Sequence, residues 1–296
     1  MTSQQFPGTK LDAELDPRFT FDFVALDPED DLDDTGTRWS TWLTVEPLCR
    51  GPQPRPDWVV TSQAAIDTEL GILKTGKEAD AFLLERAVPD SDALGESVVM
   101  VAKRYRGEEH RTFHRSASYT EGRRTRNTRD MRAMTNKTAY GRSVAAGQWA
   151  RAEWEALVRC HELGLPVPYP VQIDGTEILM EWIRSDGADG SDTAPRLAQT
   201  RPEPDLLASY YEQMREVLTT LTEHGLVHGD LSPYNVLAAG ERLVVIDLPQ
   251  MVDLVANPAG ADFLLRDCTN ICRWFGARGL DVDEHALFGE LMAVAF

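Results

Sequence analysis

The sequence predicts an α+β fold in which a strand-rich first half precedes a mainly helical second half. Apolar runs of strand length, separated by polar turns, recur between residues 79 and 183. Longer stretches with apolar residues at helical spacing cover residues 149–163, 206–223 and 263–275. With 296 residues, of which 42% are hydrophobic, the chain can hold one two-lobed domain or two small domains.

The charge and cysteine content limit what the chain can bind and where it can work. Its 30 Lys and Arg against 48 Asp and Glu give a net charge of −18, which argues against nucleic-acid binding by the whole surface but not by a local basic patch. The four cysteines lack zinc-finger spacing and fit a reduced compartment. The first residues lack an apolar leader, and no run approaches the ~18 apolar residues of a membrane span. We therefore expect a cytoplasmic protein with no membrane partner.

Residues 1–57 are rich in Asp and Pro, with an acidic centre at residues 28–34. Such a composition buries little apolar surface, so we expect an acidic, largely flexible N-terminal extension. Its phenylalanines and tryptophans leave open the alternative that the extension docks on the folded domain. Over residues 58–73 we expect a helix-like stretch that leads into a strand.

Two features of the first half suggest a site for phosphate groups. A polar turn that carries Gly76 lies between two apolar runs and can either fold over phosphates or form an ordinary hairpin. A later apolar strand ends in Lys103, where an ammonium group can neutralise the charge of nucleotide phosphates.

Residues 104–148 form the basic segment of an otherwise acidic chain and carry many hydroxyl side chains. The simplest interpretation is a flexible, solvated loop. The alternatives are an RNA contact and a helix laid across the acidic surface.

The stretch that organises the chain, residues 224–247, carries three polar side chains at the rim of a predicted hairpin: Asp230, Asn235 and Asp247. Phosphoryl transfer with Mg²⁺ needs one Asp to orient the nucleophile, and an Asn and a second Asp to hold the metal on the phosphates. Mg²⁺ suits such a site because it takes few protein oxygens and completes its shell with phosphate and water. The alternative is a polar turn whose Asp caps a helix.

The motifs at this stretch resemble a known family. Residues 228–235 read H-G-D-L-S-P-Y-N and residues 246–250 read I-D-L-P-Q. These motifs resemble the RIO family of atypical serine/threonine protein kinases, on its archetypal branch without a winged helix. Residues 75–79, T-G-K-E-A, are similar to the nucleotide loop of that family. The resemblance covers residues 58–275.

The chain departs from the family pattern at two places and from ordinary protein kinases at a third. Pro233 replaces a usually acidic residue, and Leu248 and Pro249 replace usually small ones, but neither change removes a proposed ligand. Only a short stretch separates Asp247 from the next predicted helix, which leaves no room for an activation segment or its peptide platform. We therefore expect inefficient phosphorylation of protein substrates.

The resemblance implies a trimmed, two-lobed protein-kinase-like fold without an activation segment. Residues 58–182 would form a β-rich N-lobe with the αC helix and the flexible basic loop, and residues 183–296 a mainly helical C-lobe. In such a fold the αC helix presents a glutamate to Lys103, and the family motif assigns this role to Glu153 rather than Glu155. The two glutamates lie about 200° apart around a helix of about 3.6 residues per turn, so they cannot share a face.

The resemblance also implies the roles of the site residues. Asp230 would be catalytic, with Lys103 and Glu153 positioning the phosphates. Asn235 and Asp247 would bind the metal. The ATP-binding residues would be Thr75, Gly76, Lys77, Glu78, Lys103, Met180, Glu181 and Ile183, with His228 and Ser232 as supporting residues.

The function implied is that of an ATP- and Mg²⁺-dependent atypical serine/threonine kinase and ATPase, with Mn²⁺ as an alternative ion. We expect the chain to phosphorylate itself in the basic segment, at Ser116, Ser118 or Thr120. In the family, the implied role is in maturation of the small ribosomal subunit, with a pre-ribosomal particle or RNA as partner. Two other functions stay open: a small-molecule phosphotransferase of the aminoglycoside or choline type, which shares H-G-D-x-x-x-x-N, and a non-catalytic RNA-particle binding module.

Overall fold

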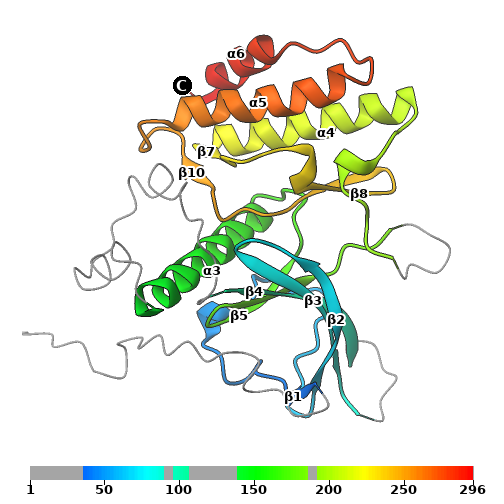
Figure 1. Cartoon of the computed structure of the whole chain (residues 1–296), viewed down its shortest axis with the longest axis vertical. Coiled ribbons are helices and arrows are strands. Elements are labelled where there is room, and N and C mark those ends of the chain that lie inside the picture. The colour runs from blue at the N-terminus through cyan, green and yellow to red at the C-terminus, as the bar shows by residue number, and fades with distance from the viewer. Residues whose placement is uncertain (1–35, 90–95, 107–138, 186–191, 296) are drawn as a thin grey trace, which may run out of the picture.

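The computed structural model describes residues 36–89, 96–106, 139–185 and 192–295. These residues form two lobes, one built on a sheet with a long helix beside it and one built on a layer of helices (Figure 1). This is the two-lobed α+β arrangement that the sequence predicts. Within the described ranges, no helix combines the length and the apolar composition that a bilayer span requires.

The first lobe contains a six-stranded antiparallel sheet in the order β1–β2–β3–β4–β6–β5. Helix α3 (Ala139–Glu162) packs against β4 and β5. In β4 successive side chains alternate between the two faces of the sheet, so Lys103 and Tyr105 share the face that α3 covers. The strands are β1 (Thr37–Trp39), β2 (Ile66–Thr75), β3 (Ala79–Ala87), β4 (Ser97–Tyr105), β5 (Pro170–Asp174) and β6 (Glu177–Glu181).

The second lobe packs three helices against two small pairs of strands. The apolar face of α4 falls at helical spacing and is buried, and a proline at its first turn suits the start of a helix. Strands β8 and β9 form a hairpin in which Val236 lies opposite Val245. The elements are α4 (Pro204–Glu223), β7 (Leu226–Val227), β8 (Val236–Ala239), β9 (Arg242–Val245), β10 (Val252–Asp253), α5 (Gly260–Gly276) and α6 (Glu284–Ala295), with 3₁₀ turns η3 (Pro47–Cys49), η4 (Leu197–Gln199) and η5 (Pro233–Asn235).

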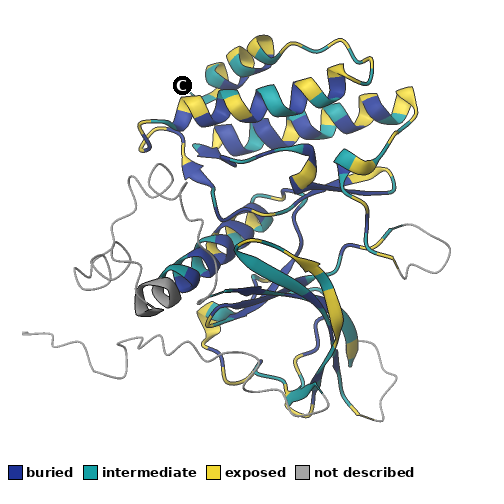
Figure 2. Cartoon of the chain, viewed as in Figure 1, coloured by how far each residue is buried: buried dark blue, intermediate teal, exposed yellow. Residues whose placement is uncertain are grey.

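One hydrophobic core runs through both lobes. It begins at Tyr105 and α3, continues through Met180, and includes the buried faces of α4, α5 and α6 (Figure 2). A smaller cluster, which includes Phe82, Leu84 and Met100, fills the opposite face of the sheet. The site residues between the lobes are therefore attached to one continuous packed interior.

Residues 36–57 are packed on the sheet, so the prediction of a flexible extension over residues 1–57 is wrong for this part. Strand β1 pairs with β2, and the Gly51 N–H donates to the Val171 carbonyl at 2.8 Å. Trp42 is buried, with the Arg55 guanidinium over its ring. The segment is acidic on average, and the prediction rested on that average. Its individual apolar residues nevertheless bury enough surface to fold. Residues 1–35 lie outside the described residues.

The basic segment is shorter than the 104–148 range predicted. Arg104 belongs to β4, and α3 begins at Ala139 rather than at residue 149. Residues 58–65 contain turns and irregular backbone in place of the expected helix. The predicted phosphate acceptors lie outside the described residues: Ser116, Ser118 and Thr120.

A network of buried charged side chains fastens β1 to the middle of the sheet. The Arg86 guanidinium donates to both Asp67 carboxylate oxygens, at 2.6 and 2.8 Å, and to the Gln172 side chain at 2.9 Å. The side chains of Arg86 and Asp67 have no exposed surface. Arg38 of β1 pairs with Glu177 and lies 3.7 Å from Asp67. Since an unpaired buried charge is costly, this network fixes which strands become neighbours.

We predict that Arg86→Met lowers the free energy of unfolding by about 3–5 kcal/mol, because it leaves the Asp67 carboxylate buried without its main partner. Denaturant titration followed by circular dichroism measures this change. The control is Arg215→Met, whose partners Glu212 and Glu290 are exposed and whose loss should cost at most about 1 kcal/mol. Equal losses in the two variants would contradict the prediction.

Candidate active site

The loop between β7 and β8 carries Asp230 and Asn235. It starts with a turn at Gly229, whose φ of 85° lies in the left-handed region that favours glycine. It ends in η5, where the Asn235 N–H donates to the Ser232 carbonyl at 2.8 Å. The Asn235 side-chain Nδ2 donates to the Asp230 carbonyl, also at 2.8 Å. The amide nitrogen is thereby fixed, and Oδ1 is the atom of this side chain that can bind a cation.

Helix α5 holds this loop through polar side chains. The Asp267 carboxylate accepts the N–H groups of Gly229 and Leu231, at 2.8 and 2.9 Å. Asn270 donates to the Leu231 carbonyl at 3.0 Å, and the Arg266 guanidinium donates to the Gly229 carbonyl. Backbone groups that a buried loop would otherwise leave unsatisfied are thus paired, which fixes the position of the loop.

The sequence predictions miss Asp267, although the sequence carries a signal for it. It lies in a buried row of α5 that includes Leu264, Cys268 and Ile271, a position where helical spacing predicts an apolar residue. Burial raises the pKa of Asp267 to about 7, and the two backbone N–H groups oppose this rise. An acidic residue in the apolar row of a helix is the pattern that points to such an anchor.

His228 is buried and connects the loop to the end of the hairpin. Its Nδ1 accepts the Asp230 N–H at 3.3 Å, and its Nε2 lies 3.4 Å from the Ile246 carbonyl. A neutral imidazole with its proton on Nε2 satisfies both contacts. Burial lowers the pKa of His228 to about 4, so the neutral form is the one present near pH 7. His228 therefore links the backbone of Asp230 to the residue that precedes Asp247.

Lys103 contacts two carboxylates that come from different parts of the chain. Its Nζ lies 2.6 Å from Glu153 Oε1 on α3 and 2.8 Å from Asp247 Oδ1, which follows β9. Burial alone would lower the pKa of Lys103, but Asp247 and Glu153 together raise it above its ordinary value. The Lys103 ammonium in turn lowers the pKa of Asp247. Lysine and aspartate are therefore both charged at neutral pH.

Glu153, rather than Glu155, faces Lys103, which confirms the predicted pairing. Glu153 is buried, and its second oxygen, Oε2, accepts the hydroxyl of Tyr105. Glu155 is exposed and pairs instead with Arg151 at 2.8 Å. Burial raises the pKa of Glu153, and Lys103 opposes this rise. The helical period places the two glutamates on different faces of α3.

Asp247 has an unusual backbone. Its φ of 67° is in the left-handed region, which non-glycine residues seldom adopt. Residues with such a backbone are found most often at functional sites. About half of its side chain is exposed, although Oδ1 contacts Lys103. The Asp247 carboxylate and Asn235 Oδ1 are hard oxygen donors of the kind that Mg²⁺ prefers, so these side chains fit that ion.

The turn between β2 and β3 approaches Asp247 and Asp230. The Gly76 N–H donates to the Ala79 carbonyl at 3.0 Å, and a Cβ at residue 76 would lie 2.5 Å from the same oxygen, so the tight turn needs glycine. Burial and the Asp247 carboxylate raise the pKa of Glu78, and Asp230 adds to this effect, which shows that the turn approaches these groups. Two other residues of the predicted loop are exposed: Thr75 and Lys77.

Three predicted ATP-binding residues, Met180, Glu181 and Ile183, lie at or just after the end of β6, in the segment that we call the hinge. The Glu181 N–H donates to the Tyr169 carbonyl at 2.9 Å, and the Ile183 carbonyl accepts the Ala194 N–H at 3.0 Å. These two groups are used within the protein, so an adenine ring would have to use the Glu181 carbonyl and the Ile183 N–H. Met180 is buried in the core next to this segment.

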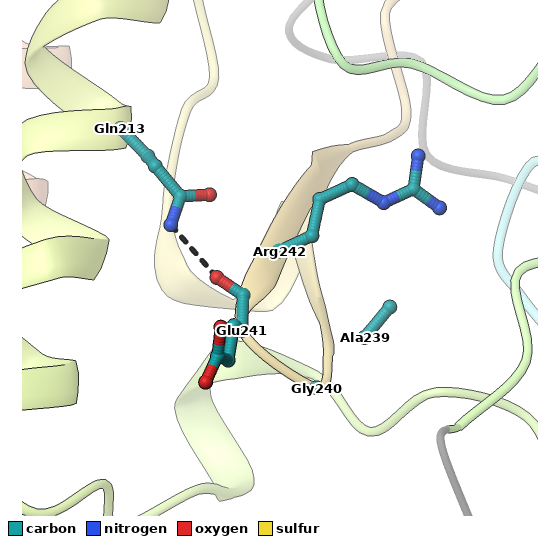
Figure 3. A pocket seen from close by; sticks show the side chains of 5 residues that line it. All are labelled: Gln213, Ala239, Gly240, Glu241 and Arg242. Atoms are coloured by element: carbon teal, nitrogen blue, oxygen red, sulfur yellow. Dashed lines mark hydrogen bonds between the residues drawn. The ribbon is translucent and has the colours of Figure 1, made fainter.

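A surface depression lies beside the turn between β8 and β9 (Figure 3). Gln213 of α4 braces the turn, because its Nε2 donates to the Glu241 carbonyl at 2.8 Å and its Oε1 accepts the Leu243 N–H at 2.9 Å. None of the predicted site residues lines this depression. The lining residues are Gln213, Ala239, Gly240, Glu241 and Arg242.

Comparison with known proteins gives consistent matches. A family model described as the RIO domain matches residues 99–287. The RIO-type serine/threonine-protein kinase Rio1 of Haloferax volcanii is 34% identical over 223 residues, which cover 75% of this chain and 68% of the relative. The serine/threonine-protein kinase RIO3 of Mus musculus is 26% identical over 238 residues, which cover 77% of this chain and 43% of the relative.

Solved structures support the same fold. The Rio2 kinase–ADP/Mg²⁺–phosphoaspartate complex from Chaetomium thermophilum matches with a TM-score of 0.54 and 22% identity, over 76% of this chain and 62% of that one. A second structure of the Rio2 kinase from that organism gives a TM-score of 0.51. The chain thus spans about two thirds or less of these proteins. The likeness confirms the kinase-like two-lobed fold, and the family match starts well after residue 58, where the resemblance was expected to begin.

We predict that His228 makes the protein less stable as the pH falls from about 6.5 to about 4. In that range the unfolded chain binds a proton at this histidine and the folded chain does not, so unfolding is favoured by up to about 3 kcal/mol. The measurement is the free energy of unfolding against pH for wild type and His228→Asn. The variant should lose this part of the slope, whereas His224→Asn, at an exposed histidine, should keep it. A wild-type slope in His228→Asn would exclude His228 as its source.

Proposed function

The chain belongs to the RIO kinase family, and from that premise we propose that it binds ATP with Mg²⁺ around Lys103 and transfers the γ-phosphoryl group to a hydroxyl group or to water. The observation that carries this proposal is the double contact of Lys103 with Glu153 and Asp247, beside the loop of Asp230 and Asn235. It supports a site that positions phosphates, because a fixed ammonium and a nearby pair of oxygen donors are what phosphoryl transfer requires.

Each part of ATP has a candidate partner. The hinge offers the Glu181 carbonyl and the Ile183 N–H to adenine, and the turn at Gly76 covers the phosphates. Lys103 neutralises charge on the α- and β-phosphates. Asn235 and Asp247 would hold Mg²⁺, which supplies charge neutralisation at the phosphate oxygens when it is bound. His228 and Ser232 support the loop through the contacts described above.

Asp230 is the candidate catalytic residue. It would orient the acceptor oxygen and take its proton as the bond from that oxygen to the γ-phosphorus forms and the bond to the β-phosphate oxygen breaks. The phosphoaspartate in the Rio2 complex suggests a second route, in which the Asp230 carboxylate itself accepts the phosphoryl group and water later releases it. The second route yields net hydrolysis of ATP.

The short connection from Asp247 to α5 favours hydrolysis and self-phosphorylation over peptide phosphorylation. Only β10 lies between Asp247 and Gly260, so the docking platform of an ordinary kinase has no counterpart here. An external peptide would gain little binding energy from the C-lobe, whereas a tethered segment reaches an effective concentration in the millimolar range.

A cytoplasmic location is proposed because the four cysteines fit a reduced compartment. Mn²⁺ as an alternative ion, and a pre-ribosomal particle or RNA as partner in small-subunit maturation, are proposed from the family resemblance. The basic segment is the proposed contact, since arginine-rich segments bind phosphate backbones.

We predict that Asp247→Ala lowers Mg²⁺-dependent ATP turnover by at least about 100-fold, because a metal clamp on the phosphates contributes several kcal/mol. Phosphate release from labelled ATP measures the rate, and circular dichroism checks the fold. Asp262→Ala, which removes an exposed carboxylate from the start of α5, is the control and should keep wild-type turnover. Near-normal turnover in Asp247→Ala would remove this residue from the proposed metal site.

We predict that the chain labels itself faster than it labels myelin basic protein, at Ser116, Ser118 or Thr120. Incubation with Mg²⁺ and ATP, followed by mass spectrometry of the intact and digested protein, locates the phosphate. Because the acceptor is tethered, the labelled fraction at a given time should not depend on protein concentration. Phosphate found only outside the basic segment, or faster labelling of myelin basic protein, would contradict the prediction.

A further inference from the structure

We propose that Tyr105 is a positioning residue for phosphoryl transfer, acting through Glu153 on the Lys103 ammonium. This inference rests on the proposed function and adds to it a residue outside the nucleotide-loop, catalytic-loop and metal motifs. Tyr105 touches neither phosphate nor metal in this proposal. Its hydroxyl orients the carboxylate that in turn orients the lysine.

The geometry assigns one carboxylate oxygen to each of two side chains on β4. Glu153 Oε1 lies 2.6 Å from Lys103 Nζ, and Oε2 accepts the Tyr105 hydroxyl at 2.5 Å. Lys103 and Tyr105 are two residues apart on a strand and share a face, so both reach the same glutamate. Lys103 Nζ also lies 5.3 Å from the centre of the Tyr105 ring, within reach of a cation–π contact. Tyr105 thus touches both members of the ion pair.

Burial makes this hydroxyl important. Tyr105 is 5% exposed and Glu153 is 1% exposed. A carboxylate oxygen in such a place has little access to water, so losing its donor leaves a buried acceptor unsatisfied. Burial and the neighbouring Glu153 carboxylate raise the pKa of Tyr105 well above its ordinary value, so the hydroxyl keeps its proton and stays a donor.

The hydrogen bond from Tyr105 to Glu153 also affects which carboxylate, Glu153 or Asp247, holds Lys103. Asp247, the proposed metal ligand, lies 2.8 Å from the same ammonium and is far more exposed than Glu153. If Glu153 were free to rotate, Lys103 could follow Asp247 and lose its fixed position over the phosphates. A hydroxyl that holds Oε2 keeps Oε1 directed at Lys103.

Backbone hydrogen bonds fix the end of β4, so the Tyr105 side chain has a fixed position from which it can orient Glu153. The Tyr105 N–H donates to the Thr176 carbonyl at 3.1 Å, and the Arg106 N–H donates to the Glu78 carbonyl of the phosphate turn at 3.0 Å. The same strand end therefore anchors the turn above the phosphates and the glutamate behind the lysine. A site that positions groups by rigid neighbours is sensitive to the loss of one such hydrogen bond.

The test is Tyr105→Phe, which keeps the ring and its packing and removes only the hydroxyl. We expect kcat for Mg²⁺-dependent ATP turnover to fall about tenfold, while KM for ATP changes by less than about threefold, since hinge and metal contacts are intact. The matched control is Tyr210→Phe. Tyr210 of α4 is equally buried, but its hydroxyl donates to the Gly240 carbonyl in the other lobe, so both kinetic constants should be unchanged.

A double-mutant cycle separates positioning from general packing. In a Glu153→Ala chain, adding Tyr105→Phe should lower kcat by less than about twofold, because the group through which Tyr105 acts is gone. The full tenfold loss in that background, or a normal kcat in the single variant, would overturn the inference. So would a Tyr105→Phe chain that does not fold. A wild-type chain without turnover would instead defeat the proposed function itself.

Discussion

The structure depends on one ammonium group that three segments share. Lys103 belongs to the sheet, Glu153 to α3 and Asp247 to the chain after the β8–β9 hairpin, and both contacts are 2.8 Å or shorter. At an effective dielectric constant of about 20, two unit charges ~4 Å apart attract by about 4 kcal/mol, and desolvation of the buried glutamate offsets part of this. The net energy is modest, but the geometric effect is large. One cation links α3, the sheet and the segment after the hairpin.

The loop of Asp230 and Asn235 has a second constraint, which comes from the short connection of the chain to α5. Leu248, Met251 and Leu254 are buried, so these side chains attach the connection to the core. A Cβ at Gly260 would lie 2.2 Å from the Leu254 carbonyl, so α5 can begin there only with glycine. About two turns later, the Asp267 side chain accepts hydrogen bonds from the loop. The short connection that replaces an activation segment therefore also places α5 where its Asp267 can hold the loop.

Features set by neighbouring residues could be predicted from the sequence, and features set by distant residues could not. The apolar run before Lys103 predicted a strand there, although β4 continues to Tyr105. The helical period separated Glu153 from Glu155. Both predictions depend on local geometry. The contacts of Asp67 with Arg86 and of Arg38 with Glu177 join residues far apart in the chain, so no local sequence pattern predicts them. The acidic average of residues 1–57 likewise concealed a folded part, since composition does not show which apolar residues find a surface to cover.

Ion pairs of the same chemistry have different consequences here because they differ in exposure. Arg86 and Asp67 have no exposed side-chain surface, so no ligand can replace either partner, and their pairing acts only on the fold. Lys103 is 18% exposed and Asp247 is 47% exposed, so solvent and solutes reach that pair. Glu153, at the other side of the same lysine, is closed off like Asp67. Lys103 therefore pairs with one closed-off carboxylate and one accessible carboxylate. This difference in exposure would allow a charged ligand to displace Asp247 from Lys103 while Glu153 keeps the lysine in place.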